Sequence, residues 1–435
     1  MRRFCALAVL IGLFFPALCA AQGDAAVPFL TIPPSASGNG MAGIAGTVPG
    51  DDPTALLANP AQLGMSGLST LLRAGFYPSS TSWMPGLPNG NMTYNVSAFS
   101  AGMNLNRFLS LPFDVGFSVA YSHIGIDYGT FVLTGESGPE PLGVFDATEH
   151  SNNWTFGIGF DYYVRLGFGF TTKSVESDLA PFDVQHQGRE GIATVSAEDA
   201  GIIAEVPATD IVRRLTGDLP GLWNCVEPAL SFSAAYARLN CGDDKVVYID
   251  PAQGDPLPRT AMAGVSYSIG FDHRGTNDRL RLIGFTGAHQ VEDLLVMRFP
   301  APVDSFGYPV GEPPPWQYAR GGGAIRFFDN VILGEGSTHA TIRKGWELNF
   351  CEFFSLRGGT VLGRGVSYST SGWGLRVGGL MKILERAVPD LQSASVYRFV
   401  ADHFDARYDH ASTTYDDPLN LNNGVTYNGL LFIVK

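Results

Sequence analysis

The strongest constraint on the fold is a two-residue alternation of large apolar side chains with small or polar ones. In one stretch Trp154, Phe156, Ile158 and Phe160 alternate with Thr155, Gly157, Gly159 and Asp161. Side chains on a β-strand point to opposite faces with period two. This stretch therefore predicts a strand with one apolar, aromatic face and one small, polar face. The same pattern recurs at 113–123, 164–175 and 260–272.

Strand-like segments follow one another from residue 68 to the end of the chain. The predicted strands are 68–77, 92–105, 113–123, 153–161, 164–175, 226–240, 260–272, 279–290, 322–328, 340–350, 353–362, 371–381, 396–409 and 424–434. A soluble sheet also alternates, so a secreted soluble β-rich binding protein is an alternative. Long strands and aromatic apolar faces favour an all-β fold, a transmembrane antiparallel β-barrel of about 14 strands in contact with lipid.

Residues 1–21 have the pattern of a secretory signal peptide. Arg2 and Arg3 precede a short apolar run, and Ala20 and Ala21 provide small residues for cleavage. The apolar run is well short of the roughly 20 residues that a spanning helix needs. We therefore expect export and insertion into the outer membrane of a Gram-negative-type bacterium.

Charge and cysteine spacing exclude several classes of partner. The net charge is −13 and the basic residues are not clustered, so we expect no nucleic-acid partner. Cys225 and Cys241 flank the predicted strand 226–240, which would hold them roughly 50 Å apart, too far for a disulfide. A disulfide between them is the alternative if that strand is absent. Neither these cysteines nor Cys351 has metal-ligand spacing, and we expect no metal and no cofactor.

Known catalytic patterns are not found in the sequence. It contains no H-E-x-x-H pair and no G-x-S-x-G elbow, and its eight histidines are scattered. We therefore expect a protein that is not an enzyme. An outer-membrane phospholipase would need a Ser and a His that converge on one barrel face, an arrangement that a linear sequence does not reveal.

The predicted connections differ in length. Residues 161–163 form a very tight turn and 106–112 is short, whereas 124–152 and 176–224 are long. Short periplasmic turns that alternate with long outer loops are typical of membrane barrels. The alternation fails at 273–278, which is short where a long loop is due. Within 176–224 we predict helices over 197–205, capped by Ser196, and over 210–215, capped by Thr209.

Parity along the predicted strands assigns a set of charged residues to the barrel interior. These are Arg165, Arg326, Arg357, Arg376, Arg398, Asp114, Asp161, Asp272 and Glu347. Such charges set the electrostatics of a pore or hold an inserted segment. Ion pairing among themselves, which only fills the interior, is the alternative. Glu352 breaks the parity and is expected in a turn.

Residues 22–64 are rich in Gly, Ala and Pro and contain no Lys or Arg. The segment holds, in order, Gly40 and Met41, Asp51 and Asp52, and Asn59, Pro60 and Ala61. This order resembles the amino-terminal region of PorV/PorQ-type outer-membrane proteins and, more distantly, of FadL-type transporters. The resemblance implies a fourteen-stranded barrel over 65–435 with 22–64 folded inside as a plug, and these residues at its turns and anchors. Ala42 departs from the pattern, which usually has Gly after Met.

The two branches of the resemblance imply different functions. PorV-like proteins act with secretion-system components and deliver exported proteins to the cell surface, which is our first expectation. FadL-like proteins admit hydrophobic small molecules through a gap in the barrel wall, which is the alternative.

Overall fold

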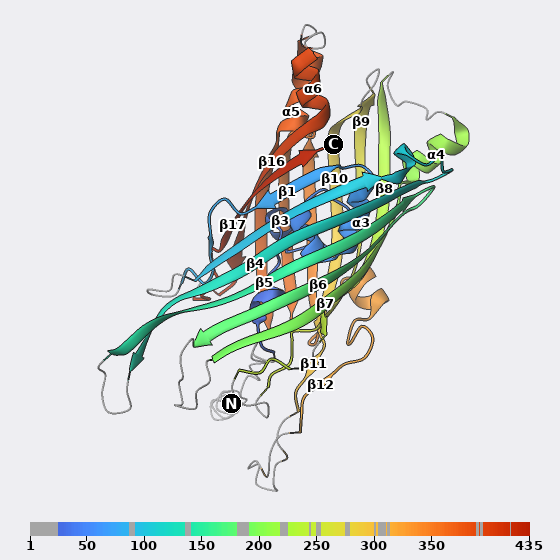
Figure 1. Cartoon of the computed structure of the whole chain (residues 1–435). Coiled ribbons are helices and arrows are strands. Elements are labelled where there is room, and N and C mark those ends of the chain that lie inside the picture. The colour runs from blue at the N-terminus through green and yellow to red at the C-terminus, as the bar shows by residue number, and fades with distance from the viewer. Residues whose placement is uncertain are drawn as a thin grey trace, which may run out of the picture.

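The strands form one antiparallel sheet that closes on itself as a barrel (Figure 1). The computed structural model describes residues 25–86, 92–134, 141–180, 191–217, 225–242, 245–248, 254–274, 279–299, 302, 310, 314–388, 391, 395–417 and 419–435. The expected signal peptide lies outside the described residues. Closure occurs at the shortest wall strand, β1, which pairs with β17 on one side and β3 on the other. The predicted transmembrane β-barrel is confirmed.

The wall has 14 strands, each paired with its neighbours in chain order. They are β1 (Leu72–Phe76), β3 (Thr93–Asn104), β4 (Asp114–Thr134), β5 (Pro141–Asp161), β6 (Arg165–Ala180), β7 (Gly191–Val206), β8 (Val226–Gly242), β9 (Thr260–Arg274), β10 (Arg279–Leu294), β13 (Thr341–Phe350), β14 (Phe354–Gly363), β15 (Val366–Arg376), β16 (Phe404–Tyr415) and β17 (Thr426–Val434). The short β2 (Thr81–Ser82) pairs with β3, and β11 (Val296–Met297) pairs with β12 (Gln317–Tyr318) outside the wall.

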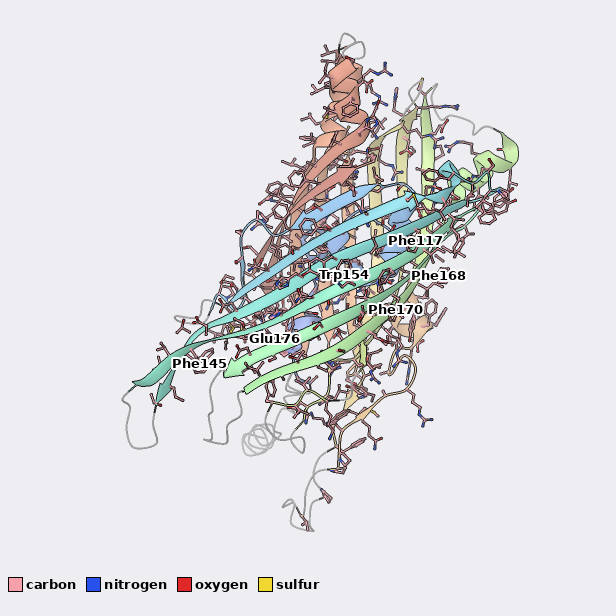
Figure 2. All side chains as sticks on the ribbon, viewed as in Figure 1. Phe117, Phe145, Trp154, Phe168, Phe170 and Glu176 are labelled. Atoms are coloured by element: carbon pink, nitrogen blue, oxygen red, sulfur yellow. The ribbon has the colours of Figure 1, made fainter. Side chains whose placement is uncertain are left out.

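The aromatic face of the alternating strands points outward. Phe117, Trp154, Phe168 and Phe170 are exposed and follow β4, β5 and β6 (Figure 2). Thr155, between Trp154 and Phe156, is fully buried on the inner side. Aromatic side chains that surround the barrel face lipid, and the small side chains face the interior.

Residues 176–224 are not the long, partly helical loop that we expected. β6 continues to Ala180, and the predicted helix over 197–205 is instead part of β7. Ala, Glu and Ile favour a helix locally, but β7 pairs with β6 and β8 and alternates buried and exposed residues, so tertiary pairing overrides propensity. Among the described residues of 176–224, only α4 (Ala208–Thr216) is helical, and it starts after Pro207. The Thr209 hydroxyl accepts a bond from the backbone N–H of Leu230 (2.8 Å) instead of capping the helix.

A second error offsets the first in the strand count. The predicted strand 322–328 is a turn that leads into η5, a π-helix over Phe327–Ile332. When β7 is added to the predicted strand order, the short connection 273–278 lies at the same end of the barrel as the tight turn after β5. The connection 273–278 is therefore at an end where a short turn is due, although the β7–β8 connection at this same end is long. We call this end, which carries α4, the short-turn end, and the opposite end the long-loop end (Figure 1).

Two predicted strands are partly helical. Residues 377–381 belong to α5 (Val377–Ala387) and 396–403 to α6 (Ser395–His403), which stand together above β15 and β16 (Figure 1). The chain leaves the sheet at Gly378 and Gly379, where a Cβ on Gly379 would lie 2.3 Å from the carbonyl carbon of Glu352. None of the helices among the described residues is both long and apolar enough to cross a membrane.

The N-terminal segment occupies the interior of the barrel. It contains η1 (Pro28–Thr31), α2 (Ala36–Gly40), η2 (Pro53–Leu57) and α3 (Ala61–Gly67). α2 contacts β14 to β17, and α3 contacts β3 to β7 on the opposite wall. We refer to residues 25–70 as the plug. A further short helix, η3 (Leu105–Arg107), lies in the turn between β3 and β4.

Candidate functional site

The small inner faces of β4 to β7 accommodate helix α3. A Cβ on Gly169 would lie 2.1 Å from the carbonyl carbon of Pro60, and one on Gly157 would lie 2.5 Å from the backbone nitrogen of Gly64. No real Cβ tolerates such distances, so side chains here would displace the helix. The strand face of small residues that the sequence shows is therefore the surface on which α3 packs.

Asn59 connects the plug to the wall. Its buried side chain accepts a bond from the N–H of Ala61 (3.0 Å) and donates to the carbonyl of Gly46 (3.0 Å). It also donates to the carbonyl of Ile202 in β7 (3.4 Å). A Cβ on Gly201 would lie 2.0 Å from the Asn59 Oδ1. Pro60 follows directly and provides the N-cap residue of α3.

Gly40 and Met41 pack against the opposite wall. A Cβ on Gly40 would lie 3.2 Å from the Arg357 Cβ, and Met41 is buried beside Ala288. Ala42 adopts a φ of 63°, a left-handed conformation that favours glycine. Its N–H donates to the hydroxyl of Thr370 (2.9 Å), and its carbonyl accepts from Arg343 (2.8 Å). Two hydrogen bonds to the wall therefore hold the backbone of Ala42, the residue that departs from the family pattern.

Asp51 binds two arginines of the wall. Its carboxylate lies 2.9 Å from Arg376 Nη2 on β15 and 3.1 Å from Arg407 Nη1 on β16. We call these three residues the clamp. Burial alone would raise the pKa of Asp51, but the guanidinium groups of Arg376, Arg407 and Arg73 outweigh it and lower the pKa well below its usual range. The clamp is thus charged across the physiological pH range.

Asp52 shapes the plug instead of reaching the wall directly. Its carboxylate accepts bonds from the N–H of Thr54 (2.9 Å) and the hydroxyl of Ser35 (2.6 Å). The Arg407 Nη2 lies 3.9 Å away. Asp52 therefore fixes the two turns that present Asp51.

The clamp continues into a network of inner-wall charges. Arg407 binds Asp409 (2.6 Å), which also binds Arg357 (2.6 Å). Arg357 in turn binds Glu347 (2.5 Å). On the other side, Arg376 binds Asp405 (2.5 Å). Charges that are buried in this way stabilise only when paired, so the pairing is part of the structure.

Most of the predicted interior charges line one cavity of about 690 Å³ at the short-turn side of the plug. The charged residues in its lining are Asp51, Asp52, Asp114, Asp161, Arg165, Glu205, Arg281, Glu347, Glu352, Arg357, Arg376 and Arg407. Arg165 binds Asp161 (2.9 Å) and Glu205 (3.3 Å). Asp114 accepts from Asn106 (2.9 Å), and Asp272 binds Arg281 (2.5 Å).

Two of the assignments by parity are wrong. Arg326 precedes η5 in the connection after β10, and Arg398 lies on α6 beyond the start of β16. Neither residue is on a wall strand, so strand parity does not apply to it. Glu352 lies in the turn between β13 and β14, as expected, and binds Lys382 of α5 (2.7 Å).

Sequence reasoning missed several residues of the interior, including Arg407, Arg73, Arg343 and Glu205. A signal for Arg407 was present, because Asp405, Arg407 and Asp409 alternate with Phe404, Ala406 and Tyr408. The unrecognised helix α6 hid this pattern within the predicted strand 396–409. Glu205 was missed with β7.

Toward the long-loop end, the interior contains an apolar cluster. Plug residues Phe29, Leu56 and Leu63 form a buried cluster with Val96 and Ile124 of the wall. Further wall members of the cluster are Ile126, Val175, Val195, Ala197, Val425 and Tyr427. The interior toward the long-loop end thus holds an apolar cluster beside buried charges, among them Glu149 and the Lys173–Asp199 pair (2.8 Å).

The wall is weakest where its first and last strands meet. β1 pairs with β17 only over Leu72–Phe76, and β2 pairs only with β3, while β17 continues to Thr426. Behind this seam Tyr77, Tyr94 and Tyr427 form ring contacts at 6.1 and 6.5 Å. The Tyr77 hydroxyl donates to the carbonyl of Pro34 in the plug (2.8 Å). The plug and an aromatic cluster therefore close the seam from inside.

A largely apolar hollow of about 470 Å³ lies beside the seam. Its lining comes from β1, β3, β4, β5 and β17. Small side chains, Ala74 and Ala101, lie among Phe99, Trp154 and Phe432. The hollow has the size and polarity for a small hydrophobic molecule.

Similar solved structures include a toluene transporter. The Pseudomonas putida toluene transporter TodX is 10% identical with a TM-score of 0.37, over 92% of this chain and 96% of that one. A Pseudomonas aeruginosa FadL homologue is 11% identical (TM-score 0.30), over 92% of this chain and 97% of that one. CdiB from Acinetobacter baumannii is 8% identical (TM-score 0.32), over 83% and 60%. No family model and no curated protein sequence matches. Similarity at this level does not define a function.

Proposed function

We propose that this chain is an outer-membrane channel for hydrophobic small molecules. The molecule enters the interior beside the apolar cluster from the long-loop end and leaves sideways through the seam between β17 and the β1–β2 segment. The plug blocks this route until its residues beside Tyr77 move. The interior charges hold the plug and present a polar surface at the short-turn end.

The observation that carries this proposal is the position of the seam. On its inner side lie apolar and aromatic residues bound to the plug, and beside its outer side lies the apolar hollow. A hydrophobic molecule that crosses here avoids the charged cavity at the short-turn side of the plug.

Small hydrophobic cargo fits the structure better than the exported proteins implied by the PorV resemblance. The plug packs against both walls through buried residues. The cavity beside the aromatic cluster, which Tyr427 and Trp83 help to line, has a volume of only about 30 Å³. Passage of small apolar molecules needs a local movement, whereas a polypeptide needs the whole plug to leave.

A disulfide across the plug and the seam tests the route. A Cβ on Gly429 of β17 would lie 2.8 Å from the Cβ of Ala36, so cysteines at both positions can be bridged after a small shift. In a background with Cys225, Cys241 and Cys351 replaced by serine, the oxidised pair should reduce uptake of a hydrophobic fluorescent probe to the level of cells without the protein. Reduction should restore uptake.

A matched control links two wall strands and leaves the plug free. The hydroxyls of Thr155 and Thr171 lie 2.8 Å apart on β5 and β6, so the pair Thr155→Cys and Thr171→Cys can be bridged there. Uptake in this variant should stay at the wild-type level. Equal probe uptake with and without the wild-type protein would refute the channel, and normal uptake in the oxidised Ala36–Gly429 pair would refute the route.

A further inference from the structure

Two clusters of the same residue types lie on the outer surface, on either side of the seam. In the first, Asn152 Oδ1 accepts from the Tyr121 hydroxyl (2.8 Å) and lies 2.9 Å from His123 Nδ1, while Trp154 contacts the Tyr121 ring. In the second, Asn428 Oδ1 accepts from the Tyr408 hydroxyl (2.7 Å) and lies 2.9 Å from His410 Nδ1. Trp373 contacts the Tyr408 ring.

The clusters lie at similar height on the barrel. The register runs from Tyr121 through β3, β1 and β17 to Ala406 of β16. Strands of such barrels tilt by about 40°, so points of equal height shift by about one residue per strand. Over four strands this places Tyr121 level with His410, in the second cluster.

Together the clusters define one border of the lipid-facing band. Aromatic girdles lie at the interfaces of membrane barrels. On the long-loop side of Trp373 the outward residues of β15 are Ser371, Ser369 and Ser367, which are polar. On the short-turn side the outward residue is Leu375. The apolar band therefore extends from the clusters toward the short-turn end.

On β15 the strand is too short to complete this band. From Trp373 the strand continues only to Arg376, which spans roughly 10 Å along the strand, against the roughly 25 Å height of the band. On β4 the strand from Tyr121 to Asp114 spans about twice as much. Helix α5 begins directly after Arg376, and its 11 residues add roughly 16 Å.

The apolar side of α5 faces away from the barrel. Val377, Leu380, Leu384 and Val388 are exposed and lie on one stripe of the helix. The opposite side packs on the rim, where Lys382 binds Glu352 and the Gly378 N–H donates to Asp405 (2.8 Å). A helix that packs on its protein in water turns its apolar stripe inward. This helix has the reverse orientation.

Helix α6 also turns apolar side chains away from the barrel, and a hydrogen bond connects it to α5. The Tyr397 hydroxyl donates to the carbonyl of Met381 (2.5 Å). Val396 and Phe399 are 75% and 56% exposed on the other side, next to exposed Phe404 at the start of β16. The outward apolar surface is thus continuous from the two strands onto both helices.

We propose that the α5–α6 hairpin completes the lipid-facing wall of the barrel. Its exposed apolar stripe contacts the hydrocarbon of the leaflet at the short-turn end, where β15 stops short. The hairpin is then part of the membrane-embedded surface and not an appendage in water. This inference depends on the barrel and not on the proposed transport route.

Spin labels on the full chain in phospholipid vesicles test the proposal. Labels are attached to cysteines at Leu384 and Val396 in a background in which the three native cysteines outside the signal segment are replaced by serine. Collision with oxygen, which dissolves in hydrocarbon, is compared with collision with a water-soluble nickel complex. Phe156→Cys on the outer wall is the lipid reference, exposed Leu419→Cys is the water reference, and Asp402→Cys is a matched control on the polar side of α6.

The oxygen-to-nickel ratio at Leu384 and Val396 should be close to that at Phe156 and several-fold above those at Leu419 and Asp402. A shift of gel mobility on heating verifies that each labelled barrel is folded. Ratios equal to that at Leu419 would place the hairpin in water and overturn the proposal. Low collision with both reagents would mean that a second copy of the chain covers the stripe, which would overturn it as well.

Discussion

The side-chain amide of Asn59 joins three backbone segments, two in the plug and one in the wall. Removing it leaves the carbonyls of Gly46 and Ile202 and the N–H of Ala61 without their partner in a buried region. An unsatisfied buried polar group costs about 1–3 kcal/mol. At this scale the position of the plug is set by single polar contacts.

Asn59→Ala should loosen the plug without opening the barrel. We expect faster hydrogen exchange of plug backbone amides, by roughly one to two orders of magnitude for a loss of about 1–3 kcal/mol. Asn95→Ala, at an exposed position on β3, is the control and should leave exchange unchanged. Unchanged exchange in Asn59→Ala would contradict the anchoring role.

The clamp should resist acid. Because the pKa of Asp51 is lowered on folding, its contribution to stability is complete above the ordinary value of 3.8 and is lost only as the pH falls further. Ion conductance of single barrels in planar bilayers should therefore stay low from pH 7 down to about pH 4. In Asp51→Asn the plug should be looser and conductance higher already at pH 7. A wild-type barrel that opens between pH 6 and pH 4 would show that Asp51 is not the controlling group.

At the scale of elements, the inner wall and the plug helix fit through small residues. Gly157→Val should push α3 away from β5, since its Cβ would collide with Gly64. We expect a folded barrel with increased conductance. Gly143→Val on the same strand meets no atom within 4 Å and should behave as wild type. A closed channel in Gly157→Val would show that α3 accommodates the side chain.

Element prediction succeeded where the period of two was local and strong, as at Trp154–Phe160. It failed at β7, where helix-forming residues pair into a sheet through neighbours distant in sequence. It also failed at α5 and α6, because apolar residues continue from strand to helix and only Gly378 and Gly379 indicate the change. The plug motif was visible in the chain, but its partners on β15 and β16 depend on closure of the barrel.

At the scale of the whole molecule, the two ends of the barrel should differ in access from outside the cell. Long loops of such barrels face the exterior. Leu419→Cys, between β16 and β17, should react with a membrane-impermeant maleimide on intact cells. A variant that keeps only Cys225, exposed at the start of β8 on the short-turn end, should react only after permeabilisation. The reverse pattern would invert the orientation.

The strand that directly follows the plug pairs with the last strand of the chain, which has a consequence for biogenesis. The interior is enclosed only after β17 has been made and has met β1. A nascent or truncated chain that lacks β17 therefore holds its plug in an open trough, where proteases of the envelope have access to it. Closure of the final pair is both the last step of assembly and the step that protects the plug, so complete and incomplete chains should differ sharply in lifetime.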